Sequence, residues 1–193
     1  MKLLLVCVSF LVIIASSVRA ETYKFDPTHS KIAFQLRHLL GTARGEFHKF
    51  SGTIDFDRER PERSTVTAII QVASIDTKIA KRDQHLRSAD FFDAAKFPEI
   101  TFRSRAVKRT GADSGDITGD LTMHGVTRPI TLHVKVASPL TGDSLPVRTG
   151  WQVTTDPIHR KDFNLVFSGS TEAVSGIGQD VVPAIEIEAV RAE

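Results

Sequence analysis

The feature of this sequence that most constrains the fold is a period-two alternation of apolar and polar residues that recurs along most of the chain. In the first clear run, residues of one parity are mostly apolar and those between them are small or polar: Ile32, Phe34, Leu36 and His38 against Ala33, Gln35 and Arg37. Comparable runs occupy 50–56, 66–72, 100–102, 117–123, 130–136, 151–153 and 181–187. Successive side chains of a strand point to opposite faces, so each run predicts a half-buried antiparallel β-strand.

Turn-forming residues separate these runs, and one stretch interrupts the alternation. Residues 121–130 predict a tight hairpin around His124-Gly125. Within 77–93, Ile79, Leu86 and Phe92 have helical rather than strand spacing. We therefore expect a short helical insertion there, capped at its start by Asp76 or Thr77.

Many strands with one apolar face have to bury that face, either between two sheets or inside a barrel. A barrel of about eight strands encloses just enough space for side chains or for one small ligand. The expected fold is therefore all-β and antiparallel, and periodicity alone leaves open whether its interior is a packed core or a cavity.

The N-terminal segment has the three parts of a secretory signal peptide. Lys2 precedes an apolar run from Leu3 to Ala15, and small or modest residues, Val18 and Ala20, stand at the positions that a signal peptidase reads. A retained membrane anchor is the alternative, but it would need about 18 or more apolar residues. We predict that residues 1–20 are a cleaved signal peptide, that residues 21–193 form a single domain, and that the protein is exported to the periplasm.

Export also changes the chemistry that remains. The only cysteine, Cys7, lies in the predicted signal peptide, near the start of its apolar run and away from the position of a lipid-modified cysteine. The mature chain then contains no thiol, which excludes disulfides, thiol catalysis and cysteine–zinc sites. Removing Lys2 and Arg19 leaves 23 basic and 23 acidic residues, so no overall charge attracts the chain to nucleic acid.

The candidates for catalysis and metal binding are weak. None of the seven histidines forms a His-Glu-x-x-His or His-x-His pattern, so we expect no metal site. Arg82, Asp83 and His85 could orient a catalytic base, or they could form a structural clasp that ties the helical insertion to the barrel. No nucleophile elbow accompanies them, so we favour the clasp and expect no catalytic residue and no enzymatic activity.

Several motifs, taken in chain order, resemble those of YceI-like proteins. They are Tyr23 to Ser30, Gly45-Glu-Phe47, Phe50-Ser-Gly52, Ser74 to Thr77, Arg82 to Leu86, Asp90-Phe-Phe-Asp93, Phe97-Pro98, Gly119 to Pro129 and Arg160 to Phe163. The resemblance implies an extended, lipocalin-like antiparallel β-barrel with one short helical insertion. It further implies that a long amphiphilic lipid, a polyisoprenoid or isoprenoid quinone, binds in the barrel interior, and that members are commonly periplasmic and often homodimers.

The function expected from these observations is lipid binding for storage, shielding or transport, with transient membrane contact, no nucleic-acid partner and no cofactor besides the lipid. The residues expected to line the tunnel share the apolar parity: Phe34, Leu36, Phe50, Ile70, Val72, Phe92, Phe102, Leu121, Met123, Leu132, Val134 and Trp151. Two alternatives remain, namely an enzyme that acts on such a lipid through Arg82, Asp83 and His85, and a dry-cored structural or interaction protein.

Overall fold

The structure is a computed structural model that describes residues 20–137, 148–167 and 176–192. The predicted signal peptide and Cys7 lie outside the described residues, apart from Ala20, so cleavage and export stay predictions. No helix in the described part of the chain is long and apolar enough to cross a bilayer.

Eight antiparallel strands close into a barrel, as the sequence predicted. In barrel order they are β1 (Glu21–Phe25), β4 (Phe50–Phe56), β5 (Thr65–Gln71), β7 (Glu99–Arg109), β8 (Ser114–Met123), β9 (Val126–Val136), β10 (Arg148–Thr155) and β12 (Ile177–Arg191). The barrel closes where β12 pairs with β1, through the register Tyr23 to Arg191 and Phe25 to Ala189. Closure removes the exposed edges that an open sheet would present.

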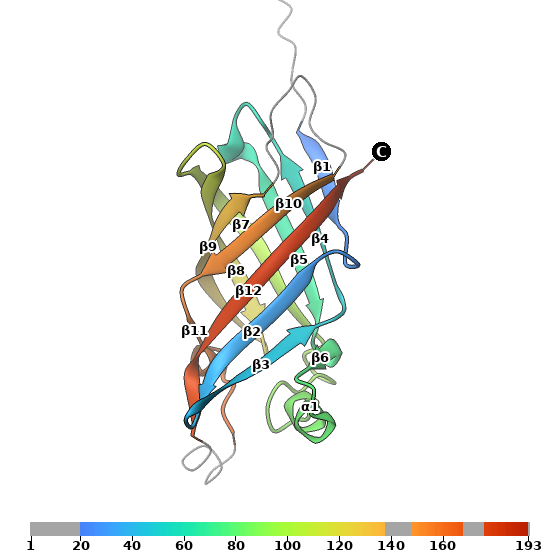
Figure 1. Cartoon of the computed structure of the whole chain (residues 1–193), viewed down its shortest axis with the longest axis vertical. Coiled ribbons are helices and arrows are strands. Elements are labelled where there is room, and N and C mark those ends of the chain that lie inside the picture. The colour runs from blue at the N-terminus through green and yellow to red at the C-terminus, as the bar shows by residue number, and fades with distance from the viewer. Residues whose placement is uncertain (1–19, 138–147, 168–175, 193) are drawn as a thin grey trace, which may run out of the picture.

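The barrel is extended at one end by additional strands. β12 has 15 residues, so it pairs with β1 near its C-terminus and with β2 (Lys31–His38) along its first part. β2 then pairs with β3 (Gly41–Phe47), whose last two residues pair with β6 (Ile75–Asp76), while β11 (Ile158–His159) pairs with β12. Figure 1 shows this extension below β1, at the end where the short helix α1 (Ala80–Arg87) lies.

The predicted strand phases agree with the burial of the side chains. On β8, Ile117, Leu121 and Met123 are buried, whereas Thr118 between them is exposed. One prediction of a strand residue is wrong: β5 ends at Gln71, and Val72 begins the 3-10 turn η2 (Val72–Ser74). The alternation could not show this end, because the turn buries Val72 as deeply as a strand would.

The hairpin at His124-Gly125 is present, with both residues at positive φ (51° and 73°). Two positive φ values in a two-residue loop match the right-handed twist of the flanking strands. The predicted helix is also present, but it is shorter than the stretch 77–93 and its N-cap residue is Ile79, which makes no side-chain cap. The expectation that Asp76 or Thr77 caps the helix is therefore wrong. The remaining short elements are the 3-10 turns η1 (Pro61–Arg63) and η3 (Arg160–Phe163).

Candidate ligand cavity

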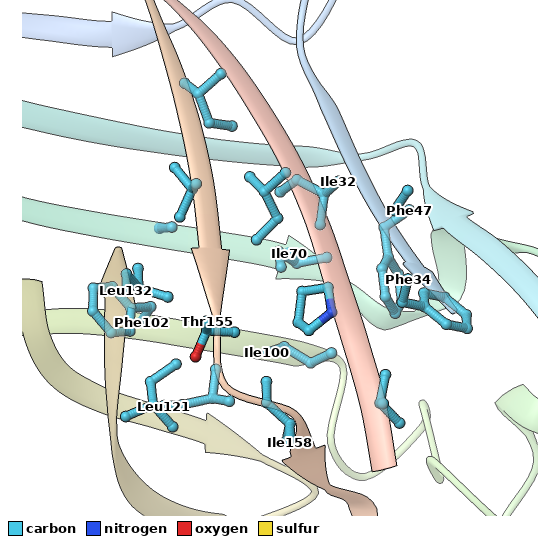
Figure 2. A pocket seen from close by; sticks show the side chains of 18 of the residues that line it. Ile32, Phe34, Phe47, Ile70, Ile100, Phe102, Leu121, Leu132, Thr155 and Ile158 are labelled. Carbon is cyan, nitrogen blue, oxygen red and sulfur yellow. The ribbon is translucent and has the colours of Figure 1, made fainter. Parts of the chain in front are cut away.

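A cavity of about 1200 Å³ runs through the barrel. All eight barrel strands and β2 contribute to its wall, and Figure 2 shows Ile70, Ile100, Phe102, Leu121 and Leu132 around one part of it. The inward side chains are almost all aliphatic or aromatic because they belong to the apolar parity of each strand. A space of this size, which would hold about 40 water-sized groups, is not a close-packed dry core.

Most of the residues predicted to line the tunnel do line this cavity. Ten of the twelve form its wall: Phe34, Leu36, Ile70, Phe92, Phe102, Leu121, Met123, Leu132, Val134 and Trp151. Phe50 and Val72 do not, although both are buried. Val72 belongs to the turn η2, and Phe50 begins β4, so both lie at strand ends rather than along the wall.

The inward-facing Gly119 lets the Phe102 ring pack directly against the backbone of β8. A Cβ on Gly119 would lie 2.5 Å from the Phe102 ring and 2.5 Å from the backbone oxygen of Arg103. Both distances are far below van der Waals contact, so only glycine lets β7 and the Phe102 ring approach β8 this closely. The ring can therefore lie against the wall.

One end of the barrel, which we call the helix end, consists of the β2–β3 hairpin, α1 and residues 163–167. A continuous series of aromatic rings crosses the cavity wall there: Phe34, Phe47, Phe92, Phe91 and Phe167, with centroids 4.6 to 6.3 Å apart. Figure 2 shows Phe34 beside Phe47. The last pair, Phe91 and Phe167, is stacked, which joins the segment after α1 to the segment after η3.

The other end, which we call the opposite end, consists of residues 57–64 and 109–114. Here the lining becomes polar and includes Arg58, Ser64, Arg109 and Asp113. Trp151 lies on the wall of β10 and meets Phe56 edge to face, with the ring centroids 5.8 Å apart. Its indole N–H is buried and has no hydrogen-bond partner in the described part of the chain.

The predicted clasp exists in part and centres on Thr77, which the sequence did not single out for this role. The buried Asp83 carboxylate accepts hydrogen bonds from the Thr77 backbone N–H (2.9 Å) and hydroxyl (2.5 Å). The Arg82 guanidinium donates to the Thr77 hydroxyl oxygen (2.7 Å) and carbonyl oxygen (2.8 Å). Arg87 donates to the carbonyl oxygen of Ile75 in β6 (3.2 Å), so the helix is held to the strand before it.

His85 is not part of this clasp, which corrects the prediction. Residues two apart on a helix point to different faces, so His85 turns away when Asp83 turns toward Thr77. Its ring instead packs against Phe167, with centroids 5.7 Å apart, and it lines the cavity mouth as an exposed residue. The three residues therefore do not converge on one point, as the catalytic alternative would require.

The buried Arg160 holds two segments of the helix end together. The sequence analysis named this residue only as part of the motif Arg160 to Phe163 and predicted no role for it. Its guanidinium donates to the carbonyl oxygens of Leu165 (2.6 Å) and Gly178 (3.1 Å) and lies over the Phe167 ring. These bonds fix the turn after η3 against β12, so this side chain stabilises the wall at the helix end.

Two groups of potential metal ligands occur in the described residues, and sequence spacing alone did not show them. They are Asp26, His29 and Glu188, and Glu46, His48 and Asp76. In each group a protein cation already joins the two carboxylates: Arg148 contacts Asp26 and Glu188, and Lys78 contacts Asp76 and Glu46. The two groups are therefore ion-pair networks on the barrel surface.

These networks lower the pKa of one carboxylate in each of them. Hydrogen bonds from Arg148, and next from His29, hold the pKa of Asp26 well below its ordinary value. The Lys78 ammonium, and next His48, do the same to the pKa of Asp76. Both carboxylates are on the outside of the barrel, so these shifts concern stability rather than chemistry in the cavity.

The polar groups of the cavity are not arranged for acyl transfer. Among the described lining residues, the two serines, Ser64 and Ser114, belong to the opposite end, whereas the two histidines, His38 and His85, belong to the helix end. A serine nucleophile needs a base within hydrogen-bond reach, and these pairs are separated by the length of the barrel. The described polar groups of the cavity therefore do not form the serine–histidine pair that acyl transfer requires.

Comparison with known proteins agrees with this geometry. The family model described as the YceI-like domain matches residues 23–189. A UPF0312 protein of Pectobacterium atrosepticum is 40% identical over 190 residues, which cover 97% of this chain and 95% of that protein. Protein YceI of Escherichia coli is 42% identical over 154 residues, covering 78% of this chain and 80% of that protein.

Solved structures with the same fold extend the comparison. BcnA of Burkholderia cenocepacia superposes with a TM-score of 0.77 at 26% identity, covering 86% of this chain and 99% of that one. A polyisoprenoid-binding domain from Saccharophagus degradans, implicated in plant cell wall breakdown, superposes with a TM-score of 0.64 at 18% identity. That match covers 88% of this chain and 98% of the other, and it shows a shared fold.

Proposed function

The chain belongs to the YceI-like family, and from that premise we propose that it binds one long-chain isoprenoid lipid, a polyisoprenoid or an isoprenoid quinone, inside its barrel. The observation that carries the proposal is the apolar cavity of about 1200 Å³ that runs along the barrel. The Saccharophagus degradans domain, described as polyisoprenoid-binding, suggests the class of ligand.

The dimensions of the cavity support a long chain over a compact ligand. Drug-sized ligands occupy pockets of roughly 300–1000 Å³, so this cavity exceeds that range. At about 30 Å³ for each water-sized group, it accommodates about 40 heavy atoms, or about eight five-carbon units. Each buried methylene contributes about 0.8 kcal/mol, which offsets the entropy lost when a flexible chain is ordered.

The polar residues at the two ends support an amphiphilic ligand. Between the ends, the inward residues of β5, β7 and β9 offer no charged group, so a hydrocarbon chain fits there. In the described part of the lining, the charged residues lie near the two mouths, among them Arg58 and Arg109 at the opposite end and Lys81 and Arg82 at the helix end. A polar head group would therefore be placed at a mouth, and the chain along the barrel.

We further propose that the protein works in the periplasm, where it stores, shields or carries the lipid. Transport between membranes requires a carrier that covers the chain on all sides, which a closed barrel does. The localisation rests on the signal peptide predicted for residues 1–20, and N-terminal sequencing of the exported protein should give Glu21 as the first residue.

Mass spectrometry of an organic extract from freshly purified protein tests the ligand. We expect a long-chain isoprenoid in stoichiometric amount. The variant Leu132→Trp places an indole in the cavity and should lose the lipid, whereas Lys135→Trp adds the same indole to the exposed face of the same strand and should retain it. Extracts free of lipid from several preparations of the wild type, or equal lipid in both variants, would contradict the proposal.

A further inference from the structure

Large exposed apolar side chains gather at the helix end of the barrel. Leu40 is fully exposed, at 102% of its reference area, and Leu39 is 60% exposed, and the two form the tip of the β2–β3 hairpin. Ile79 before α1 and Val166 after η3 are 52% and 43% exposed. The only other two in the described part of the chain, Ile69 and Val182, lie singly on the outer wall of the barrel.

The backbone of the hairpin tip holds these leucines outward. Leu39 has a φ of 50°, a left-handed conformation that asparagine and glycine adopt far more readily than leucine. Its N–H donates to the carbonyl oxygen of Gly176 (2.9 Å), which fixes the turn next to the start of β12. The Leu39 side chain packs over Gly176 but stays 60% exposed, and Leu40 beyond it is fully exposed, so packing on the barrel accounts for only part of Leu39 and for none of Leu40.

The charges of the helix end are unbalanced toward positive. The hairpin residues 37–44 contain Arg37 and Arg44 and no acid. α1 contains Lys81, Arg82 and Arg87, and its one acid, Asp83, is buried against Thr77. The exposed Asp90 after the helix, which lies 3.7 Å from His85, reduces this excess without cancelling it. Neither Arg44 nor Lys81 has an ion-pair partner among the described residues, and both are exposed.

The opposite end has neither feature. Residues 57–63 contain three basic and three acidic residues, and 108–116 contain two of each. The cavity also reaches the surface there, beside Arg109 and Asp113, but no large exposed hydrophobic residue of the described part belongs to that rim. Figure 1 shows the two ends separated by the full length of the barrel.

We propose that the helix end is the face that docks on an anionic lipid bilayer, with Leu39 and Leu40 entering the interfacial region and the cations of the hairpin and α1 meeting lipid phosphates. Apolar side chains rimmed by Lys and Arg are the features of interfacial membrane contact. Ile79 and Lys81 line the cavity and are exposed, so the cavity opens on this face. The inference rests on the proposed function in one respect, since it gives the lipid a route into the barrel without crossing water.

Quenching by brominated phospholipid tests which end touches the membrane. A tryptophan replaces Leu40 at the helix end, and in the matched control it replaces the exposed Ala112 at the tip of the β7–β8 hairpin, at the opposite end. The native Trp151 is buried in the barrel and supplies the same background in both variants. With vesicles of phosphatidylglycerol and brominated phosphatidylcholine, we expect Leu40→Trp to be quenched and Ala112→Trp to be unchanged.

Vesicle flotation measures the strength of binding. The double variant Leu39→Asn and Leu40→Asn should fold normally, because asparagine suits the positive φ, and its partition coefficient should fall at least about tenfold. Ile69→Asn, which removes an exposed apolar side chain from the barrel wall, should bind as the wild type does. Lys81→Gln should weaken binding about fivefold, and added salt should weaken it further.

The vesicles contain no isoprenoid, so these results do not depend on what the cavity binds, and a failure here leaves the mass-spectrometric test of the ligand unaffected. Equal quenching of both tryptophans, quenching of Ala112→Trp alone, or no binding of the wild type to anionic vesicles would overturn the proposal. A dimer in sedimentation analysis that the double asparagine variant dissociates would also overturn it, because a second copy would then cover the leucines.

Discussion

At the residue scale, two of the three side chains that the sequence marked as chemically suggestive, Arg82 and Asp83, prove to hold structure together. Thr77 is the hub: it donates two hydrogen bonds to Asp83 and accepts two from Arg82, and it is itself buried. A buried hydroxyl and N–H that lose their acceptor cannot be rehydrated without opening the site. The position of α1 therefore depends on these few hydrogen bonds. Because α1 borders one mouth of the cavity, the shape of that mouth depends on them as well.

Replacing Asp83 by alanine should remove the acceptor and leave both Thr77 donors unsatisfied. We expect the free energy of unfolding to fall by about 1–3 kcal/mol, measured by denaturant titration of the delipidated protein. Asp90→Ala, at an exposed carboxylate near the same helix, is the control and should change stability by less than about 0.5 kcal/mol. Normal stability with complete loss of function in Asp83→Ala would favour the catalytic interpretation instead.

The ion-pair network around Asp26 should make stability depend on pH in a defined direction. Arg148 and His29 lower the pKa of Asp26 in the folded protein below its ordinary value of 3.8, so at low pH the unfolded chain binds this proton first. The contribution of the ionised Asp26 to the free energy of unfolding is complete above about pH 4 and is lost as the pH falls through the pKa of Asp26 in the folded protein. We therefore expect the Tm of the wild type to exceed that of Asp26→Asn at neutral pH, and the difference to shrink below about pH 4.

Salt provides the control for this measurement, because the network lies at the surface and salt screens exposed charges. The Tm difference at neutral pH should decrease at high ionic strength. A difference that stays constant from neutral to acidic pH would show that the network does not contribute through ionisation.

At the scale of elements, the sequence was informative wherever a pattern is local. Alternation predicted the strands and their inward faces, because one buried face leaves an apolar residue at every second position. The His124-Gly125 turn could be located for a similar reason. Features that depend on distant segments could not be predicted, because tertiary packing determines them. Examples are the end of β5 before Val72, the contact of the Phe102 ring with Gly119, and the hydrogen bond from Arg148 to Asp26.

The hairpin that joins β8 and β9 offers a test at this scale. Gly125 has a φ of 73°, and an added Cβ would lie 2.7 Å from the Phe97 ring. Gly125→Ala should therefore cost about 1–2 kcal/mol from the backbone alone, with a further loss from displacement of the ring. Thermal unfolding of the delipidated protein measures this.

Gly150 provides the matched control, since a Cβ there would meet only Ala137 Cβ at 3.4 Å and the backbone of β10 is extended. Gly150→Ala should leave the Tm unchanged or raise it slightly, because alanine costs less conformational entropy than glycine in a strand. Equal Tm values for the two variants would mean that the turn at Gly125 tolerates a side chain and does not fix the hairpin.

At the scale of the whole molecule, the same strands serve both stability and the cavity. The barrel buries Tyr23, Ile54, Ile100, Ile187 and Ala189 in its wall and still leaves a cavity of about 1200 Å³. Such a void forfeits the dispersion contacts that a packed core would supply, so an occupant that fills it should stabilise the fold. Occupancy and stability are therefore linked, and the link depends on how much of the cavity the ligand fills.

This dependence predicts a stability series with isoprenoids of increasing length. A ligand present at 100 times its Kd stabilises the fold by about 2.7 kcal/mol, which raises the Tm of a domain of this size by roughly 5–11 °C. Each added unit buries more apolar surface and lowers the Kd, so at one fixed ligand concentration the rise should grow with chain length until the cavity is full at about eight units, and then level off. Differential scanning calorimetry with isoprenoids shorter and longer than eight units measures the series. In Leu132→Trp the rise in Tm should level off at a shorter chain, whereas in Lys135→Trp it should follow the wild type. A rise that is independent of chain length, or identical in Leu132→Trp and the wild type, would show that the lipid binds outside the barrel.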